Sequence, residues 1–478
     1  MNRRTKIVAT VGPASERSEK ILALIKAGVN VFRLNLSHGD INNHINVANR
    51  IRRQAKKLNH QIGILADLQG PKIRITQFQN GYVDLKRGNN FTLNLELTNK
   101  MGNETGVGIN YPPLLNFLES GDTLLLDDGR LQLKVKSVEN MAIHCQVTIG
   151  GVLSSNKGIN KLGGGLAAPA LTKKDIADIL ALGKLKPDFV AVSFVLSEED
   201  IHETRKRLKE NNISPAIIAK IERAEVVADE TIIDKILEHS DGIMVARGDL
   251  GVEVGDAALI GIQKHLIRRA RQMNRVVITA TQMMESMVNN PMPTRAEVFD
   301  VANAVLDGTD AVMLSAETAV GSHPIAVVAA MSTTCLGAER HPTATTSRYR
   351  VERQFHSAEE SIAMAAIYAA NHYSNVKCIV SLTESGRTPL LMSRLSSGLP
   401  IYALSQQSVT LRKLCLCRGV IPLYFNYNEQ GEPELQQQIL DFLGKYQEFS
   451  SGDHLLMTKG EIMGSPGNTN VLKILKLP

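Results

Sequence analysis

Eight short apolar segments, rich in β-branched residues, constrain the fold of this chain more than any other feature. Their nearly continuous apolar character is typical of strands buried on both faces of a parallel sheet. They are Lys6–Gly12, Val29–Ser37, Gln61–Gln69, Phe189–Val195, Ala216–Glu222, Asp241–Arg247, Arg275–Gln282 and Ala311–Ala319. Helix-like stretches lie between them, as at Ser15–Ala27, Asp40–Leu58 and Lys173–Leu185. This alternation predicts βα units.

The eight segments fall into two blocks, residues 1–71 and residues 169–340. Together the blocks hold 243 of the 478 residues. An eight-stranded β/α barrel typically takes about 250 residues. The sequence therefore predicts a catalytic (β/α)8 barrel that is interrupted after its third strand.

The interruption, residues 72–168, alternates apolar and polar residues at Phe91–Leu97 and Leu131–Lys136. Asn80-Gly81 and Asp128-Gly129 are turn signals. This pattern predicts a small antiparallel β-domain inserted in a loop of the barrel.

The tail, residues 341–478, forms a further predicted domain, which contains both helices and strands. Its predicted helices and strands are Ala358–Ala370, Cys378–Leu382, Arg387–Leu395, Ile401–Leu404, Leu455–Thr458 and Val471–Leu475. The fold class is α/β: a TIM barrel, an inserted small β-barrel domain and a C-terminal α/β domain.

The composition excludes several classes of protein. Hydrophobic residues make up 43% and charged residues 21% of the chain, which argues against a disordered protein. The net charge of +6 is spread evenly, so no basic arm for nucleic acid is present. Five scattered cysteines do not form a secreted disulfide framework, and Cys415-x-Cys417 is interpreted as core thiols. No apolar run is long enough to span a membrane, so we expect a cytoplasmic protein.

Charged residues follow the apolar segments at their C-terminal ends, where barrel enzymes carry their catalytic groups. Lys220 and Glu222 end the fifth segment on the same side of the strand, and Asp249 follows the sixth. Two carboxylates with a substrate phosphate suit Mg²⁺. The alternative is a salt bridge from Glu222 to Arg247 or Lys220.

A metal ion, Lys220 and Arg33 would form a cationic pocket for a transferring phosphoryl group. An ion-pair network that stabilises the barrel mouth is the alternative. The amide of Gly248 can approach an anion closely, although a plain turn glycine explains it equally. The chain has no GxxxxGK[ST] loop, and Gly163-Gly164-Gly165 opens no helix, so any nucleotide must be held by the barrel mouth and the insertion.

Six motifs, in order along the chain, together resemble the pyruvate kinase family. They are Arg33-x-Asn35-x-Ser37-His38-Gly39, Asp67-x-x-Gly70-Pro71-x-Ile73-Arg74, Ala219-Lys220-Ile221-Glu222, Ala246-Arg247-Gly248-Asp249-Leu250-Gly251, Ala280-Thr281-Gln282-Met283 and Leu314-Ser315-Ala316-Glu317-Thr318. The resemblance implies phosphoryl transfer from phosphoenolpyruvate to ADP, giving pyruvate and ATP in the last step of glycolysis. It also implies dependence on Mg²⁺ or Mn²⁺, a homotetramer, and an insertion that acts as a lid over the nucleotide.

The resemblance also implies roles for individual residues. Glu222 and Asp249 would bind Mg²⁺, and Lys220 would stabilise the phosphoryl group and the enolate. The expected substrate contacts come from Arg33, Lys220, Gly248, Asp249 and Thr281, and the nucleotide contacts from Asn35, His38, Arg74 and Lys157. Thr281 and Ser315 would relay a proton to the enolate through water, since a hydroxyl is itself a weak acid.

The chain departs from the family's common pattern at two positions. K⁺-dependent members carry Glu where this chain has Lys72, and they usually carry Thr where this chain has Leu68. In those members the K⁺ ligands would correspond to Asn35, Ser37 and Asp67. Because an ammonium at Lys72 repels a neighbouring cation, we expect that K⁺ is not required. The alternative is a solvated loop lysine.

An effector loop is expected in the tail, where hydroxyls and amides could cradle a phosphate. Its residues are Thr383, Ser385, Gly386, Arg387 and Thr388. Glu384 stands where Lys is frequent, and the later loop, Gly460–Ser465, lacks the basic or aromatic residue that clamps a second phosphate in fructose-bisphosphate-regulated members. The pattern therefore favours a monophosphate such as AMP or ribose 5-phosphate over an unregulated loop.

Two other functions remain open at the level of sequence. The first is a Mg²⁺-dependent barrel lyase on an oxaloacetate- or pyruvate-like acid, which would have no need of Arg74, Lys157 or the insertion. The second is a non-catalytic sugar-phosphate sensor, which should have lost Lys220, Glu222 or Asp249.

Overall fold

The computed structural model describes residues 3–97, 101–166, 168–346, 354–427, 431–462, 464 and 467–477. Contacts between Cα atoms divide the chain into two compact units. The first holds residues 1–66, 184–190 and 267–478, and the second holds residues 67–183 and 191–266.

Eight parallel strands close into a barrel in the order β1-β16-β15-β14-β13-β12-β3-β2. They are β1 (Lys6–Thr10), β2 (Val31–Asn35), β3 (Gly63–Asp67), β12 (Phe189–Val192), β13 (Ala216–Ile221), β14 (Gly242–Ala246), β15 (Val276–Ala280) and β16 (Ala311–Leu314). Each lies within one of the eight apolar segments, and every residue of β1, β3, β12, β14, β15 and β16 is buried. The predicted barrel is therefore confirmed.

Helices follow the strands, as the alternating pattern predicts. Their bounds are α1 (Ser18–Ala27), α2 (Ile41–Lys57), α3 (Lys173–Leu185), α4 (Glu198–Glu210), α5 (Ala224–Ala228), α6 (Glu230–His239), α7 (Arg247–Val254), α8 (Asp256–Gln272), α9 (Arg295–Asp307), α10 (Ala316–Ala319), α11 (Pro324–Ala338) and α12 (Pro342–Thr345), with a 3₁₀ turn η2 (Glu285–Val288). Local sequence sets the ends: Thr294 and Glu297 form a capping box that begins α9, and Gly308 ends it with a left-handed φ of 94°.

The insertion forms two sheets, one of six strands in the order β11-β7-β8-β9-β5-β6 and one of two strands, β10-β4. The elements are β4 (Tyr82–Leu85), β5 (Asn90–Asn94), β6 (Gly106–Val107), η1 (Pro112–Phe117), β7 (Thr123–Leu126), β8 (Leu131–Glu139), β9 (Ala142–Ile149), β10 (Gly151–Ser154) and β11 (Ile159–Lys161). Leu126 and Leu131 face each other across the predicted Asp128-Gly129 turn. The inward-facing residues of these strands share one buried apolar cluster.

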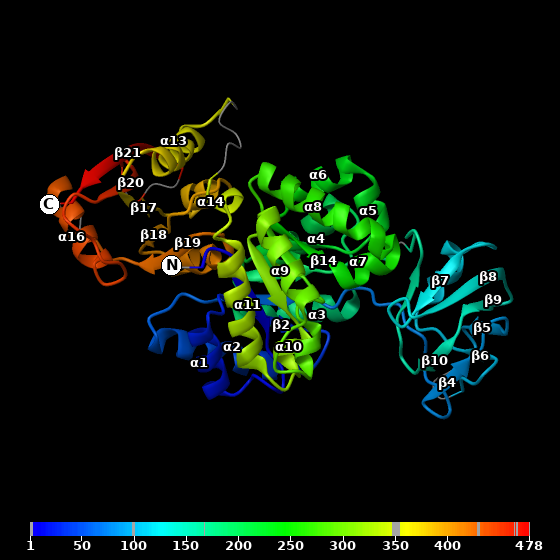
Figure 1. Cartoon of the computed structure of the whole chain (residues 1–478). Coiled ribbons are helices and arrows are strands. Elements are labelled where there is room, and N and C mark those ends of the chain that lie inside the picture. Colours follow the sequence, from blue (N-terminus) through cyan, green and yellow to red (C-terminus); the bar gives the residue numbers. More distant parts are fainter. Residues whose placement is uncertain are drawn as a thin grey trace. The chain divides into compact units, whose positions relative to one another are not determined.

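The C-terminal elements form a five-stranded sheet, β19-β18-β17-β20-β21, in which only β21 is antiparallel (Figure 1). They are α13 (Ala358–His372), β17 (Val376–Leu382), α14 (Arg387–Ser393), β18 (Ile401–Ser405), α15 (Ser408–Lys413), η3 (Leu414–Leu416), β19 (Val420–Tyr424), α16 (Glu432–Leu443), β20 (His454–Gly460) and β21 (Thr469–Lys476). The six tail elements expected from sequence are present.

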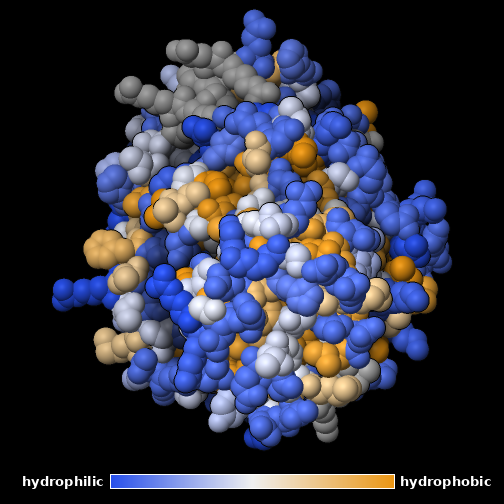
Figure 2. Space-filling view, turned by 90° about the vertical axis from the view of Figure 1, so that its right-hand side faces the viewer, coloured by the Kyte–Doolittle hydropathy of each residue, from blue (hydrophilic) through white to orange (hydrophobic). Residues whose placement is uncertain are grey.

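All five cysteines are free and buried, which confirms Cys415 and Cys417 as core thiols. Among the described residues, none of the helices has the length and apolar character that crossing a bilayer requires. On the face shown in Figure 2, hydrophilic residues separate small hydrophobic areas from one another.

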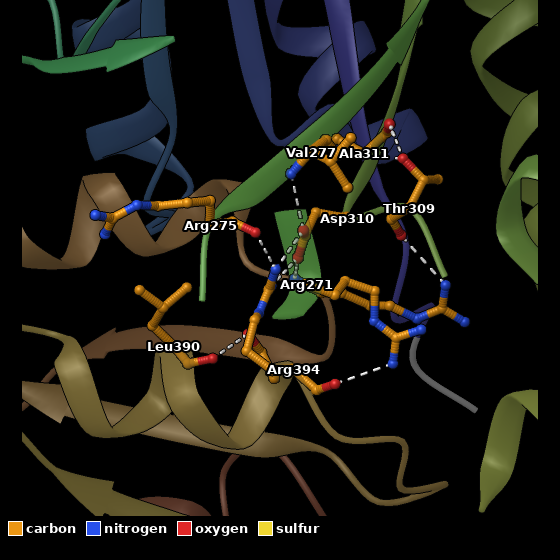
Figure 3. A network of polar contacts seen from close by, with 10 residues as sticks. Arg271, Arg275, Val277, Thr309, Asp310, Ala311, Leu390 and Arg394 are labelled. Carbon is orange, nitrogen blue, oxygen red and sulfur yellow. Dashed lines mark hydrogen bonds and ion pairs between the residues drawn. The ribbon is translucent and has the colours of Figure 1, made fainter. Parts of the chain in front are cut away.

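A buried ion pair links the C-terminal elements to the barrel within the first unit (Figure 3). Arg394, at the end of α14, donates from both Nη atoms to the carboxylate of Asp310, which precedes β16. Both side chains are 1% exposed. Asp310 also accepts from the backbone amides of Val277 and Arg418, so its two oxygens are fully hydrogen-bonded.

Candidate active site

The second unit carries a buried charged cluster around Lys220, which lies on β13 next to its end. Lys220 Nζ donates to Ser193 Oγ at 2.8 Å and lies 2.9 Å from Glu222 Oε1 and 3.5 Å from Asp67 Oδ1. The lysine side chain is 12% exposed, whereas the two carboxylates are 0% and 1% exposed. The ammonium is therefore the part of the cluster that reaches toward solvent.

The two oxygens of Glu222 have different partners, a backbone amide at Oε2 and the Lys220 ammonium at Oε1. Its Oε2 accepts a hydrogen bond of 2.7 Å from the amide of Phe194. Its buried Oε1, although close to Lys220 Nζ, accepts no hydrogen bond of good geometry within the described part of the chain. Burial raises the pKa of Glu222; Lys220 opposes that shift, and the neighbouring charge of Asp249 adds to it.

These observations fit a divalent cation. A buried carboxylate oxygen without a hydrogen bond is costly unless a ligand completes it. The influence of Asp249 on the pKa of Glu222 shows that the two carboxylates are neighbours. Two carboxylates, together with water and a substrate phosphate, are a ligand set that Mg²⁺ accepts.

The backbone around the cluster explains how Ser193 and Phe194 reach it. Gly70 has a φ of 68°, and a Cβ there would lie 2.6 Å from Ser193 Cβ, so this loop needs glycine. Ser193 Oγ donates to Leu68 O at 2.7 Å. Phe194 has a φ of 55°, a strained value for a bulky residue, and this turn directs its amide at Glu222.

A second buried ion pair, between Arg223 and Glu253, lies next to the cluster, because Arg223 directly follows Glu222 in the chain. The guanidinium of Arg223 lies 5.0 Å from the centre of the Phe194 ring and 3.3 Å from Glu253 Oε1. Glu253 also accepts from the amide of Ala224 at 2.9 Å. Burial raises the pKa of Glu253 to about 7 despite the opposing charge of Arg223.

Glu253 also links this cluster to the end of the insertion. Its carbonyl accepts from the amide of Gly163, and Glu225 accepts from the amide of Gly165. Gly248 and Asp249 lie in the first turn of the same helix, α7.

The expected nucleotide contacts Arg74 and Lys157 lie close together within the second unit. Arg74 pairs with Gly158 in a short antiparallel bridge and donates from Nη1 to Asn156 O at 2.8 Å. Lys157 Nζ forms a 2.6 Å ion pair with Asp127. The backbones of these two cationic residues are thus adjacent, and the charge of Lys157 is partly neutralised by Asp127.

The other expected site residues belong to the first unit, where each has its own local support. Arg33 Nη1 donates to Thr10 Oγ1 at 3.1 Å. Asn35 Oδ1 accepts from the amide of Ser37 at 3.2 Å, and the amide of His38 bonds to Asn35 O. These contacts order the turn that follows β2.

Thr281 and Ser315 stand at the ends of β15 and β16 in unusual conformations. Thr281 has a φ of 65°, which is strained for a β-branched residue, and its Oγ1 donates to Ala280 O. The amide of Ser315 donates to Glu317 Oε2 at 2.6 Å. The buried Oγ of Ser315 has no hydrogen-bond partner in the described structure, so it remains available to a substrate or water.

Of the expected effector loop, Thr383, Ser385 and Thr388 line a small cavity of about 30 Å³ in the C-terminal elements, and Gly386 and Arg387 are not part of its lining. Gly386 has a φ of 81°, and its amide donates to Thr383 Oγ1, while the amide of Arg387 donates to Ser385 Oγ. Thr388 Oγ1 bonds to Thr469 Oγ1 at 2.7 Å. Glu384 and Glu359 also line the cavity, and Arg387 is paired with Glu359 at 2.9 Å. Of the later loop, Met463 and Ser465 lie outside the described residues.

Sequence reasoning did not single out Ser193, Thr10, Glu317 or Glu253 as functional residues. Ser193 and Thr10 each stand at the end of a barrel strand or just after it, so the strand-end rule could have found them. Glu253 lies one helical turn after Asp249, and nothing in its neighbours along the chain indicates that it pairs with Arg223.

A closed barrel with charged groups at its strand ends defines the class of (β/α)8-barrel enzymes. A family model described as "Pyruvate kinase, barrel domain" matches residues 2–328, and one described as "Pyruvate kinase, alpha/beta domain" matches residues 360–475. The chain therefore belongs to the pyruvate kinase family of phosphotransferases.

Individual relatives agree with this assignment over the whole chain. A pyruvate kinase of Haemophilus influenzae is 53% identical over 96% of both chains. Pyruvate kinase II of Salmonella typhimurium is 52% identical over 99% of this chain and 98% of that protein. A crystal structure of a pyruvate kinase from Cryptosporidium parvum covers 100% of this chain and 96% of its own, with 34% identity and a TM-score of 0.90.

Proposed function

We propose that the chain catalyses Mg²⁺-dependent phosphoryl transfer from phosphoenolpyruvate to ADP, giving pyruvate and ATP as the last step of glycolysis. The observation that carries the proposal is the Lys220–Glu222 cluster, in which a buried carboxylate oxygen lacks a hydrogen bond beside an ammonium. Membership of the pyruvate kinase family supports it.

Lys220 would hold the transferring phosphoryl group and then the enolate oxygen. Glu222 and Asp249 would hold Mg²⁺, which when bound supplies positive charge to the phosphoryl oxygens. Arg33, fixed by Thr10, would hold the phosphate, and the amides of α7 would hold the substrate carboxylate. Fixed positive charges of this kind stabilise charge that develops in the transition state.

Thr281 and Ser315 would complete the reaction by passing a proton from water to the enolate carbon. The strained backbone of Thr281 and the unpartnered hydroxyl of Ser315 support this role, because both features are tolerated where they serve a ligand.

Asn35, His38, Arg74 and Lys157 would contact the nucleotide. We propose residues 1–71 and 169–340 as the catalytic barrel and residues 72–168 as a lid over the nucleotide, with residues 341–478 as an allosteric domain. The enzyme would assemble as a homotetramer, as the family resemblance implies.

Lys72 would replace the monovalent cation, so K⁺ would not be required. The test is the rate with K⁺ exchanged for tetramethylammonium at constant ionic strength. An unchanged rate is expected in the unmodified enzyme, and Lys72→Glu should create a dependence on K⁺. A large loss of rate in the unmodified enzyme would contradict this part of the proposal.

The effector would be a monophosphate such as AMP or ribose 5-phosphate, bound by the loop of Thr383, Ser385, Gly386, Arg387 and Thr388. The small cavity and its two carboxylates support one phosphate rather than two. Initial rates at low phosphoenolpyruvate should rise with a monophosphate and not with fructose 1,6-bisphosphate. The reverse response would contradict this assignment.

A single assay tests the main function: pyruvate formation, coupled to lactate dehydrogenase, from phosphoenolpyruvate, ADP and Mg²⁺. Omission of either ADP or the metal should abolish the signal. Pyruvate released from oxaloacetate without ADP would indicate a lyase, and no turnover with retained sugar-phosphate binding would indicate a sensor.

A further inference from the structure

A cationic cavity lies within the first unit, between the barrel and the C-terminal elements. It offers about 20 Å³ to the centres of water-sized molecules. Arg4, Arg271 and Arg418 line it together with Ser393, Ser396 and Ser397, and no acidic residue is part of its lining. Three guanidinium groups thus share one small space.

The nearby carboxylates are committed elsewhere. Glu339 lies 3.8 Å from Arg4 Nε and accepts from the backbone amides of Arg4 and Thr5. Asp310 receives both Nη atoms of Arg394, and from Arg418 it receives only the backbone amide (Figure 3). The charge of the Arg418 guanidinium therefore has no ion-pair partner in the described part of the chain.

Arg418 also has hydrogen-bond donors to spare. Its Nη1 donates to Val305 O at 2.8 Å and to Thr309 O at 3.2 Å. Its Nε and Nη2, and the hydroxyl of Ser396, donate no hydrogen bond to the described residues. Burial lowers the pKa of Arg418; Glu339 and Asp310 oppose that shift, and the charge of Arg4 adds to it. The side chain of Arg418 is partly exposed, so these unused donors are open to a ligand in the cavity.

We propose that this cavity binds one small inorganic anion, with the Arg418 guanidinium and the Ser396 hydroxyl as donors and Arg4 and Arg271 as the surrounding positive charge. The volume suffices for one or two waters, so we infer a small ion. Water alone would fill the space without compensating the charge. Chloride and phosphate share the required chemistry, and guanidinium groups bind oxyanions through paired hydrogen bonds.

The first experiment locates the anion directly. Crystals of the full-length enzyme grown without other halides are soaked in sodium bromide, and anomalous diffraction is measured at the bromine edge. A peak within hydrogen-bond distance of Arg418 Nη2 is expected. A filled cavity without anomalous signal, in crystals free of phosphate and sulfate, would mean that water occupies it and would overturn the proposal.

The second experiment separates a specific site from a general salt effect. Thermal midpoints are measured in sodium chloride, sodium phosphate and sodium gluconate at equal ionic strength, for the unmodified enzyme, Arg418→Gln and Arg53→Gln. Arg53 is exposed on α2, so it is a matched loss of one positive charge. A saturable rise of roughly 2–4 °C is expected with at least one of the two small anions, in the unmodified enzyme and in Arg53→Gln only.

The comparison of chloride with phosphate identifies which anion binds more tightly. An equal rise in Arg418→Gln, or no rise over gluconate in the unmodified enzyme, would contradict the proposal. If Arg418→Gln does not fold, the bromide experiment on the unmodified enzyme decides alone.

Discussion

Glu222 and Asp310 are both carboxylates buried beside a cation, Glu222 directly after strand β13 and Asp310 directly before strand β16, yet their surroundings differ. Asp310 accepts two hydrogen bonds from Arg394 and two from backbone amides, so both of its carboxylate oxygens are fully hydrogen-bonded. Glu222 accepts one amide bond, and its other oxygen faces Lys220 without a well-directed hydrogen bond. The complete pair holds the structure together, and the incomplete one leaves a place for a ligand.

Physical cost explains why the two arrangements coexist. Breaking a buried, fully bonded ion pair costs about 3–5 kcal/mol, because the remaining charge is left without a partner. An incomplete cluster already carries part of that cost in the folded protein. Changes at Asp310 should therefore act on stability, and changes at Lys220 or Glu222 should act on turnover.

The largest expected effect is on catalysis by Lys220→Met. The charge of Lys220 is needed most in the transition state, so kcat should fall by roughly three orders of magnitude or more, while binding of phosphoenolpyruvate changes little. Steady-state kinetics and a substrate-binding titration measure the two quantities. A loss confined to KM would contradict the assigned role.

The next largest effects are expected from a matched pair of carboxylate-to-amide substitutions, Asp310→Asn and Glu222→Gln. Asp310→Asn should lower the free energy of unfolding by about 3–5 kcal/mol and leave kcat within roughly twofold. Glu222→Gln should lower stability by about 1 kcal/mol or less and reduce kcat by roughly a hundredfold or more, because Lys220 keeps Asp67 and Ser193 as neighbours.

Denaturation in guanidinium chloride, with activity measured on the same samples, checks both members of the pair. Equal losses of stability in the two variants would remove the distinction between a complete and an incomplete cluster. Thr279→Ser, in the interior of β15, serves as a control for any change in the barrel.

The smallest expected effect is on the pH dependence of stability and comes from Glu253. Its surroundings are intermediate between those of Asp310 and those of Glu222. Its pKa is raised from 4.5 to about 7, so the folded protein holds a proton that the unfolded chain has lost between these values. The contribution of Glu253 to the free energy of unfolding is therefore fully present below about pH 4.5 and is lost as the pH rises through about 7. Glu253→Gln should remove roughly 1–2 kcal/mol of this decline, because the amide does not titrate.

Unfolding of the unmodified enzyme and of Glu253→Gln at several pH values between 4.5 and 8 measures the difference. Parallel curves for the two proteins would show that Glu253 has an ordinary pKa. Glu210→Gln, at an exposed carboxylate that ends α4, serves as the control for the loss of one carboxylate.

Much of the fold could be predicted because the barrel strands are buried on both faces and so carry an unbroken apolar pattern. All eight were located, and the Asp128-Gly129 turn was predicted from residues that favour a positive φ. Strand β19 and helix α16 were not predicted. Pro422 interrupts the strand pattern of β19, which lies at the edge of its sheet, where proline is tolerated.

The candidate site was predictable only in part. Lys220 and Glu222 are two residues apart on one strand, so their proximity follows from the sequence. Ser193, Phe194 and Glu253 join them through tertiary contacts between distant segments, which local periodicity does not encode. The pairing of Asp310 with Arg394, 84 residues apart, was missed for the same reason.

The buried ion pair between Arg394 and Asp310 also limits how this chain could have been assembled or shortened in evolution. A barrel released from its tail would keep Asp310 but lose the Arg394 guanidinium and the Arg418 amide that bind its carboxylate. Loss of the tail would thus endanger the barrel itself, so natural variants should retain a tail even where regulation has been abandoned.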